Sequence, residues 1–197
     1  MSLSSLVTEV IATELVTVYV DYKNIRLSLR SAFNLDTGHF NPKKLADLIV
    51  ARRLRGSALR EVRVYRTMAD PNRDRRRARE DMRRIHRWLS EENTVFVGRP
   101  LRYIPNTGAV MEKGIDVALA IDAIVNAIDR DSDVVVIASR DSDFEPLLET
   151  LMVHQAFSRH VETVSISGMS RLTLRRTELP WCHYLSREDF EAIRDDA

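Results

Sequence analysis

The chain has 197 residues, of which 44% are hydrophobic and 30% are charged. This length and composition fit one soluble globular domain with a full-sized core, and they exclude an intrinsically disordered chain. The formal net charge of +1 indicates no class of partner, so only the distribution of charge along the chain is informative.

A single cysteine, Cys182, excludes an internal disulfide and a cysteine-based metal site. We interpret it as a small buried residue beside Trp181, and a cytoplasmic location is the default for such a chain. The N-terminal segment carries Glu9 and Glu14 and has no basic run, so a secretory signal is not expected. Hydrophobic runs all fall well short of the ~20 residues that span a bilayer, so no membrane association is expected.

Taken in chain order, the sequence predicts strands that alternate with helices. The predicted strands are near-continuous runs rich in valine and isoleucine, which is typical of strands covered on both faces. They span 15–20, 61–66, 94–97 (continuing toward 101–104), 134–139 and 161–167. The predicted helices span 42–54, 71–89, 114–129 and 143–157, and a short one opens at Ser186. This alternation predicts an α/β fold with a central, mainly parallel sheet, and the absence of a linker or repeat predicts one domain over residues 1–197.

Two of the predicted strands end in aspartate. Asp21 follows the run 15–20, and Asp141 and Asp143 follow the run 134–139. Ligands of open parallel sheets bind beyond the carboxyl ends of the strands, so these carboxylates converge if the two strands are neighbours. Each also has a purely structural interpretation, in which Asp141 caps the next helix, Asp143 favours its dipole and Asp21 lies in a turn.

The predicted helix 114–129 contributes a fourth carboxylate. At 100° per residue, Asp116 is in line with three small side chains that would let the helix approach the sheet closely: Ala120, Ala123 and Ala127. The bulky apolar face beside this line consists of Val117, Ile121, Ile124, Val125 and Ile128. Asp122 falls elsewhere on the helical wheel, near Asn126 and Asp129, which indicates a solvated surface residue.

Clustered carboxylates repel one another unless a divalent cation neutralises them. Oxygen ligands without cysteine or clustered histidine select Mg²⁺ or Mn²⁺. Such ions stabilise charge in phosphoryl transfer and lower the pKa of an attacking water. The pattern therefore predicts an acidic, metal-binding catalytic site formed by Asp21, Asp116, Asp141 and Asp143.

The segment 73–87 supplies the complementary charge, because it holds eight arginines and three acids. On the predicted helix, the apolar stripe is Ala78, Met82, Ile85 and Leu89, so the arginines project from the remaining faces. One interpretation is a solvated helix with i,i+4 ion pairs. The other is binding of a phosphate backbone by Arg75, Arg76, Arg79 and Arg83.

Three motifs, VYVDYKN, EKGIDVALAIDAI and VVVIASRDSDFEPLLE, resemble those of the NYN domain, a branch of the PIN-like nucleases. The family pattern is a strand ending in Asp with Asn three residues later, a KGxDvxLaxD helix start, and a strand followed by SGDSDFxPL. The resemblance spans about residues 15–167, in family order, and leaves 168–197 as a C-terminal extension without an assigned role beyond a final helix. It implies a three-layer, Rossmann-like (PIN-like) fold and metal-dependent cleavage of RNA.

Carried over by position, the resemblance implies that the four aspartates form the acidic site and that Asn24 is a supporting amide. Lys113 is a partner for phosphate or carboxylate, and Asp122 matches the family helix, in contrast to its surface position on the wheel. The glycine before the family's DSD motif is Arg140 here, placed either to contact a substrate phosphate or to pair with an acid and weaken metal binding.

The preferred hypothesis is therefore a Mg²⁺- or Mn²⁺-dependent endoribonuclease, a hydrolase that acts on single-stranded RNA. The alternative is a catalytically inactive PIN-like module that binds RNA or a protein partner, which Arg140 favours. Topoisomerase-primase and haloacid-dehalogenase folds fit less well, because Asp21 leads the motif order and is followed by Tyr22-Lys23. The sequence leaves open RNA against DNA and whether the protein forms a homodimer.

Overall fold

The computed structural model describes residues 13–104, 107, 109–129, 131–153, 160–174 and 179–195. The strands are β1 (Glu14–Asp21), β2 (Ser57–Met68), β3 (Thr94–Pro100), β4 (Arg102–Tyr103), β5 (Val110–Met111), β6 (Val134–Ala138), β7 (His160–Ile166) and β8 (Trp181–Leu185). The helices are α1 (Tyr22–Ala32), α2 (Pro42–Ala51), α3 (Arg75–Leu89), α4 (Ile115–Asp129), the 3₁₀ turn η1 (Ser142–Phe144), α5 (Glu145–Val153) and α6 (Arg187–Ile193). Among the described residues, none of these helices is long and hydrophobic enough to cross a membrane.

Six strands form one sheet in the order β3-β2-β1-β6-β7-β8, and every neighbouring pair is parallel. The chain first builds outward from β1 to β3, then returns to the other side of β1 with β6. This reversal is the Rossmann-type strand order, and sheets of this order bind ligands in the crevice outside the carboxyl ends of the strands at the reversal, here β1 and β6. β4 and β5 form a separate antiparallel pair.

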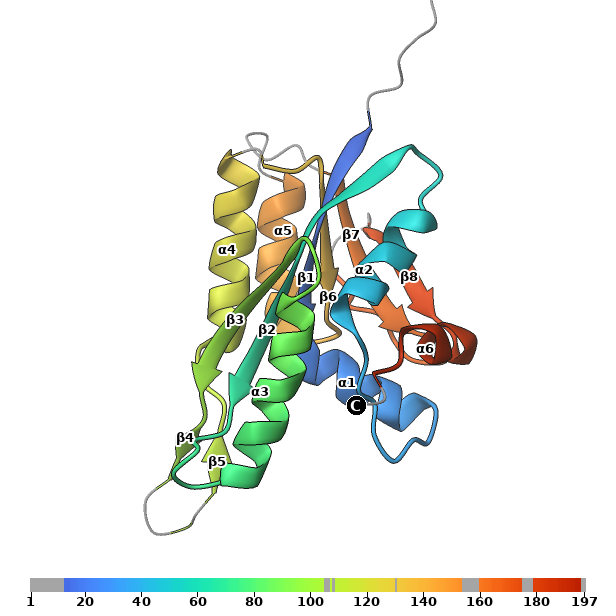
Figure 1. The fold of residues 1–197 in the computed structure, drawn as a ribbon. Helices are drawn as coiled ribbons and strands as arrows, with labels where there is room; N and C mark the ends of the chain where they lie inside the picture. Colours follow the sequence, from blue (N-terminus) through green and yellow to red (C-terminus); the bar gives the residue numbers. More distant parts are fainter. Residues whose placement is uncertain are drawn as a thin grey trace, which may run out of the picture.

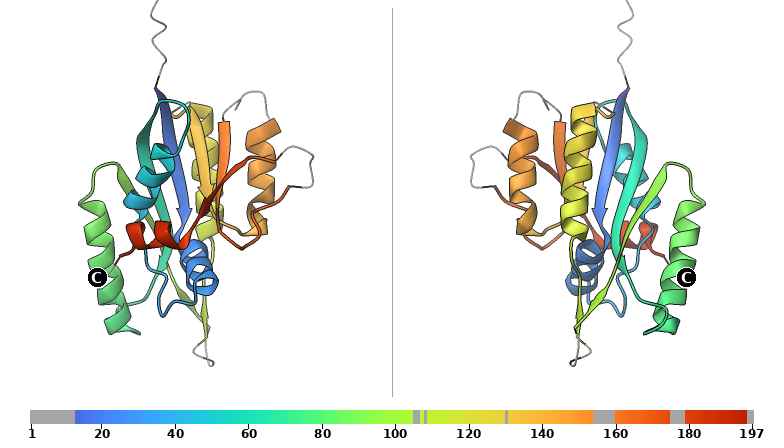
Figure 2. Two further views of the ribbon diagram at one scale, coloured as in Figure 1. Left: turned by 90° about the vertical axis from the view of Figure 1, so that its right-hand side faces the viewer. Right: turned by 90° about the vertical axis from the view of Figure 1, so that its left-hand side faces the viewer.

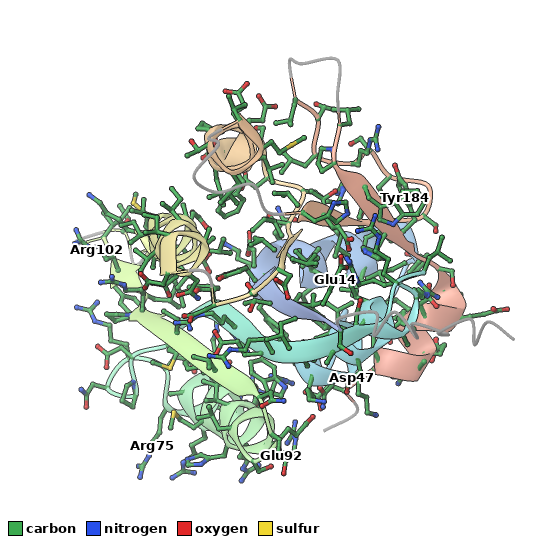
Figure 3. The ribbon with its side chains drawn as sticks, turned by 90° about the horizontal axis from the view of Figure 1, so that it is seen from above. Glu14, Asp47, Arg75, Glu92, Arg102 and Tyr184 are labelled. Carbon is green, nitrogen blue, oxygen red and sulfur yellow. The ribbon has the colours of Figure 1, made fainter. Side chains whose placement is uncertain are left out.

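Two layers of helices cover the sheet. On one face, α1, α2, α3 and α6 pack over a core that includes Val18, Leu29 and Trp88; on the other, α4 and α5 pack over a core that includes Ile137 and Leu148. The three layers are visible in Figure 1, and the views of Figure 2 place α2 and α6 in front of the sheet from one side and α4 from the other. Figure 3, which looks along the strands, shows the sheet between the two layers. The predicted α/β, three-layer fold is thus confirmed.

Most predicted elements are present, and two of the unexpected elements belong to the six-stranded sheet or to the helices that cover it. The first is α1, which follows β1 without a break and buries Tyr22, Ile25 and Leu29 at helical spacing. The second is β8, which lies at the edge of the sheet within the C-terminal extension and buries Cys182. The predicted C-terminal helix is confirmed as α6, which opens with a capping box between Ser186 and Asp189.

The buried faces of two helices differ from the wheels drawn from sequence. α4 buries Ile115, Leu119, Ala123 and Ala127, while the bulky residues Val117, Ile121, Val125 and Ile128 are 45–59% exposed. The small alanines let α4 lie close to the sheet, so its bulkier stripe is left in solvent. In α3 the buried face is Ala78, Asp81, Arg84, Ile85 and Trp88, whereas Met82 and Leu89 are about half exposed. Ion pairs explain this rotation, because Asp81 pairs with Arg66, and Arg84 with Asp195.

Candidate active site

The acidic residues predicted from the sequence lie at the crevice between β1 and β6. The two strands are parallel neighbours, with Val20 opposite Ala138, so Asp21 and the loop that carries Asp141 emerge side by side. The condition that the sequence left open, that the two strands adjoin, is therefore met. Asp116 joins them from the first turn of α4, which starts at the same edge of the sheet (Figure 1).

Asp21 is the most buried member of the group, with 8% of its surface exposed. Its Oδ1 accepts a hydrogen bond from the Asn24 backbone amide (3.1 Å), which caps α1, and its Oδ2 accepts one from Ser139 Oγ (3.1 Å). Burial, together with the charges of Asp116 and Asp141, raises the pKa of Asp21 to about 6, although these hydrogen bonds lower it. The cap does not exclude a functional role for Asp21, because each of its oxygens accepts one hydrogen bond here and can accept a second.

The loop after β6 is held by a short network. Ser139 Oγ accepts from the Asp141 amide (3.2 Å), and Asp141 Oδ1 accepts from the Asp143 amide (3.1 Å). Asp141 therefore caps η1, as the structural interpretation predicted, while its second oxygen stays available. Asn24 supports the loop from α1, since its Oδ1 accepts from the Arg140 amide at 2.9 Å.

Asp116 is exposed, and the charges of three other acids raise the pKa of its carboxylate. Partial loss of its water shell raises its pKa first, followed by the charges of Asp141, Glu112 and Asp143. Asp116 and Asp141 therefore lie close enough to repel Asp21, and Asp141 and Asp143 lie close enough to repel Asp116. Within the described residues, however, no three His, Cys, Asp or Glu side chains are arranged as a ready-made metal site. The donor set is nevertheless of the right kind for a hard divalent cation, because it consists of oxygens that carry uncompensated negative charge.

Two residues beside the site were not selected from the sequence. Glu112 accepts a hydrogen bond from Thr67 Oγ1 (2.5 Å) and pairs with Lys23 at 3.0 Å. Both lie next to motif positions: Lys23 lies between Asp21 and Asn24, and Glu112 directly precedes Lys113. This proximity in the sequence is the signal by which the two residues could have been found. Lys113 itself is exposed, as expected for a residue that meets a ligand from solvent.

The family to which the chain belongs follows from comparison with known proteins. The NYN domain profile matches residues 15–175, most of the chain. The chain belongs to the NYN domain family. A solved structure of a protein of unknown function from Vibrio parahaemolyticus has the same fold, with a TM-score of 0.62 over 90% of this chain and 95% of that one at 20% identity. A comparison with curated proteins found no match. NYN domains are nuclease-type domains of the PIN-like group, so the predicted family is confirmed.

Asp122 of this NYN domain lies apart from the crevice. Its Oδ2 accepts hydrogen bonds from Tyr65 Oη (2.7 Å) and Arg63 Nη2 (3.3 Å), which fasten the middle of α4 to β2. It is neither a free surface residue, as the wheel suggested, nor among the charges that act on Asp21. Asp122 thus joins α4, the helix that carries Asp116, to the sheet.

Arg140, which replaces the glycine usual in NYN domains, is turned away from the acids. Its guanidinium donates to Ser170 O (2.8 Å), Ser170 Oγ (3.1 Å) and Ser28 Oγ (3.0 Å). The side chain thereby joins α1 to the turn after β7. These bonds occupy the guanidinium, so Arg140 contributes to the shape of the loop more than to the charge at the carboxylates.

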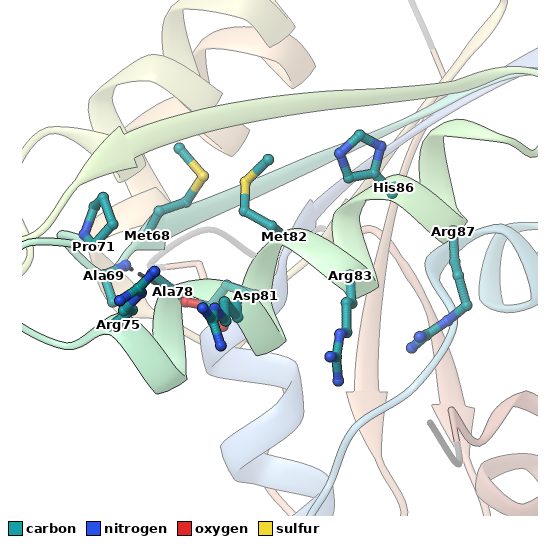
Figure 4. Close-up of a pocket in the computed structure, with 11 residues that line it drawn as sticks. Met68, Ala69, Pro71, Arg75, Ala78, Asp81, Met82, Arg83, His86 and Arg87 are labelled. Atoms are coloured by element: carbon teal, nitrogen blue, oxygen red, sulfur yellow. Dashed lines mark hydrogen bonds between the residues drawn. The ribbon is translucent and has the colours of Figure 1, made fainter.

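The basic helix α3 presents exposed arginines beside an apolar cavity of about 810 Å³. Arg75, Arg79 and Arg83 have no ion pair within the described residues, whereas Arg76 lies 3.9 Å from Glu80. In Figure 4, Arg83 and Arg87 project from the side of α3 opposite Met82 and His86. The ion pair of Arg76 fits the interpretation of α3 as a solvated helix, whereas binding of a phosphate backbone by these arginines remains a prediction.

The raised pKa of Asp21 can be tested through the pH dependence of the free energy of unfolding. Because the folded-state pKa is above the usual 3.8, the contribution of Asp21 to stability is complete below about pH 4 and is lost as pH rises through about 6. Asp21→Asn removes the charge while its Oδ1 can still accept from the Asn24 amide, and Ser139 Oγ can accept from Nδ2 where it donated to Oδ2 before. We expect its free energy of unfolding to exceed that of the wild type by up to about 3 kcal/mol at pH 7 and to match it near pH 4, as measured by urea denaturation.

The control is Asp36→Asn, which removes an exposed carboxylate from the loop after α1. It should follow the wild-type stability profile within about 0.5 kcal/mol. A constant difference between Asp21→Asn and the wild type across this pH range would contradict the assignment of a buried, repelled carboxylate.

Proposed function

We propose that the protein is a Mg²⁺- or Mn²⁺-dependent ribonuclease that hydrolyses phosphodiester bonds of single-stranded RNA. The observation that carries the proposal is a buried aspartate at the Rossmann-type crevice whose pKa is raised to about 6 by burial and by two further carboxylates. Such an arrangement costs free energy in the absence of a cation, and membership of the NYN family supports nuclease chemistry.

Asp21, Asp116, Asp141 and Asp143 would hold the ion. A divalent cation supplies charge neutralisation at the reacting phosphate and lowers the pKa of the attacking water. The protein supplies the positions: Asn24 and Ser139 fix the rotamer of Asp21 and the path of the loop after β6. Lys23 and Lys113, at the rim, provide cations for the substrate phosphates, and Arg75, Arg76, Arg79 and Arg83 provide a longer basic surface.

A second candidate, a catalytically inactive module that binds RNA or a protein, is favoured by the hydrogen bonding of Asp21. Both of its oxygens already accept bonds from protein groups, and Arg140 stands where the family has glycine. The two candidates differ in their response to metal. The enzyme requires the ion for cleavage, whereas the module binds equally well in chelator.

The test is incubation of labelled single-stranded RNA with the purified protein in Mg²⁺, in Mn²⁺ and in chelator. We expect cleavage only with metal. Independently of activity, the ion at ~100 times its dissociation constant should stabilise the fold by about 2.7 kcal/mol, which raises the unfolding temperature by roughly 5–10 °C. Sodium chloride of equal ionic strength is the control. RNA that is bound but uncut under all three conditions would favour the inactive module.

A further inference from the structure

A small pocket of about 210 Å³ adjoins the acidic site, where α1, the carboxyl end of β2 and the first turn of α3 meet. Its charged and polar lining consists of Lys23, Arg26, Arg66, Thr67, Arg77 and Glu112. Glu112 also acts on Asp116, so the pocket and the carboxylates share one wall. The pocket differs from the arginines of the outer α3 surface because three secondary-structure elements enclose it.

The cations of this pocket exceed the acids that face them. Lys23 is paired with Glu112 at 3.0 Å, and Arg66 is paired through Nη2 with Asp81. Arg26 and Arg77 have no ion pair within the described residues. Two positive guanidinium charges are therefore uncompensated. One phosphate monoester, with close to two negative charges near neutral pH, would balance them.

The arginines of the pocket also include a buried hydrogen-bond donor that has no acceptor. Arg66 Nη1 is buried and has no hydrogen-bond partner, while its guanidinium stacks 5.1 Å from the Tyr22 ring centroid. Burial lowers the pKa of Arg26, and the neighbouring charges of Arg66, Arg30 and Arg77 lower it further. Buried donors without acceptors cost free energy, and an oxyanion in the pocket would satisfy them.

We propose that this pocket binds a terminal phosphate of the RNA substrate, with Arg26, Arg66 and Arg77 as its ligands. A monoester carries close to two negative charges and has a single ester substituent, so it matches both the two uncompensated guanidiniums and the enclosed pocket. An internal phosphodiester carries one charge and requires two chain exits. A terminal phosphate held here places the adjacent nucleotides beside Asp21 and Asp116, so the protein acts near a phosphorylated RNA end. This proposal rests on the proposed function for its substrate class.

The test measures binding of one oligoribonucleotide in three forms, with a 5′-phosphate, with a 3′-phosphate and with neither, to the full chain in chelator at fixed salt. We expect one phosphorylated form to bind about tenfold tighter than the unphosphorylated RNA. Arg26→Gln and Arg77→Gln should each abolish this preference. Arg77 is exposed, so its variant keeps the test valid if the half-buried Arg26 proves necessary for folding.

The matched control is Arg30→Gln, which removes the same charge from an exposed site one turn along α1 and does not line the pocket. It should retain the tenfold preference. Equal binding of the three RNAs by the wild type would overturn the proposal, as would Arg26→Gln and Arg77→Gln both behaving like Arg30→Gln. Because binding is measured in chelator, failure of metal-dependent cleavage is a separate outcome that counts against the nuclease and leaves the pocket measurement intact.

Discussion

Asp141→Asn should lower the rate of RNA cleavage by more than about 100-fold while changing the free energy of unfolding by less than about 0.5 kcal/mol. The side chain has two separable roles. Oδ1 accepts the Asp143 amide and caps η1, and asparagine can accept the same bond. The negative charge of Asp141 acts on Asp21 and Asp116, and the substitution removes this charge, on which binding of a cation would depend. Loss of one direct ligand should exceed the 10- to 100-fold effects typical of residues that only orient ligands.

The measurement is cleavage of labelled single-stranded RNA at saturating Mn²⁺, with circular dichroism and urea denaturation to verify the fold. Asp129→Asn is the control, because it makes the same change at the far, exposed end of α4. It should cleave at the wild-type rate. Turnover by Asp141→Asn equal to that of this control would remove Asp141 from the site.

Glu162→Ala should destabilise the fold by about 3–5 kcal/mol without a direct effect on the chemistry. Glu162 is 3% exposed, pairs with the buried Arg53 and lies 2.7 Å from His183 Nε2 through Oε2. His160 Nε2 approaches its other oxygen at 3.1 Å. Removing the carboxylate leaves Glu14 as the acid paired with Arg53 among the described residues, with Ser57 Oγ accepting from Arg53 Nε at 2.9 Å.

The pH dependence of this effect has a definite sign. Burial alone would raise the pKa of Glu162, but the bonds with His183 and Arg53 hold it below the usual 4.5. Its contribution is therefore present above about pH 4.5 and is lost as pH falls through the lower folded-state value. Urea denaturation should show the full penalty of Glu162→Ala near neutral pH and a smaller penalty as the pH falls below 4.5. Glu92→Ala, at an exposed turn, should differ from the wild type by no more than about 0.5 kcal/mol; an equally small effect of Glu162→Ala would contradict the buried-pair assignment.

The parts of the fold that the sequence predicted are those with strong local patterns. Buried runs such as 134–139 were identified as parallel strands because both faces are covered, and Asn41-Pro42 marked the start of α2. The site was predicted as a set of residue types at strand ends, and the adjacency of β1 and β6 then brought Asp21 and Asp141 together. Their roles as metal ligands remain a prediction.

What the sequence did not predict depends on tertiary contacts. α1 follows Asp21 directly, so its start was interpreted as a turn, and β8 contains the polar residue His183 because Glu162 of the neighbouring strand bonds it. The buried face of α3 includes Asp81 because Arg66 reaches it from β2. Such pairs join segments that are distant in the sequence. A helical wheel describes a single segment, so it cannot predict them.

The dual hydrogen bonding of Asp21 has a consequence for sequence drift among relatives. A relative without nuclease activity would still need a side-chain acceptor at position 21 to begin α1, so a capping residue such as Asp, Asn, Ser or Thr would persist there. Positions 116 and 143 are exposed and would be released from constraint. In any relative, a capping residue at position 21 alone therefore indicates only that the start of α1 is kept. Aspartates at positions 116 and 143 would indicate that the acidic site is still used.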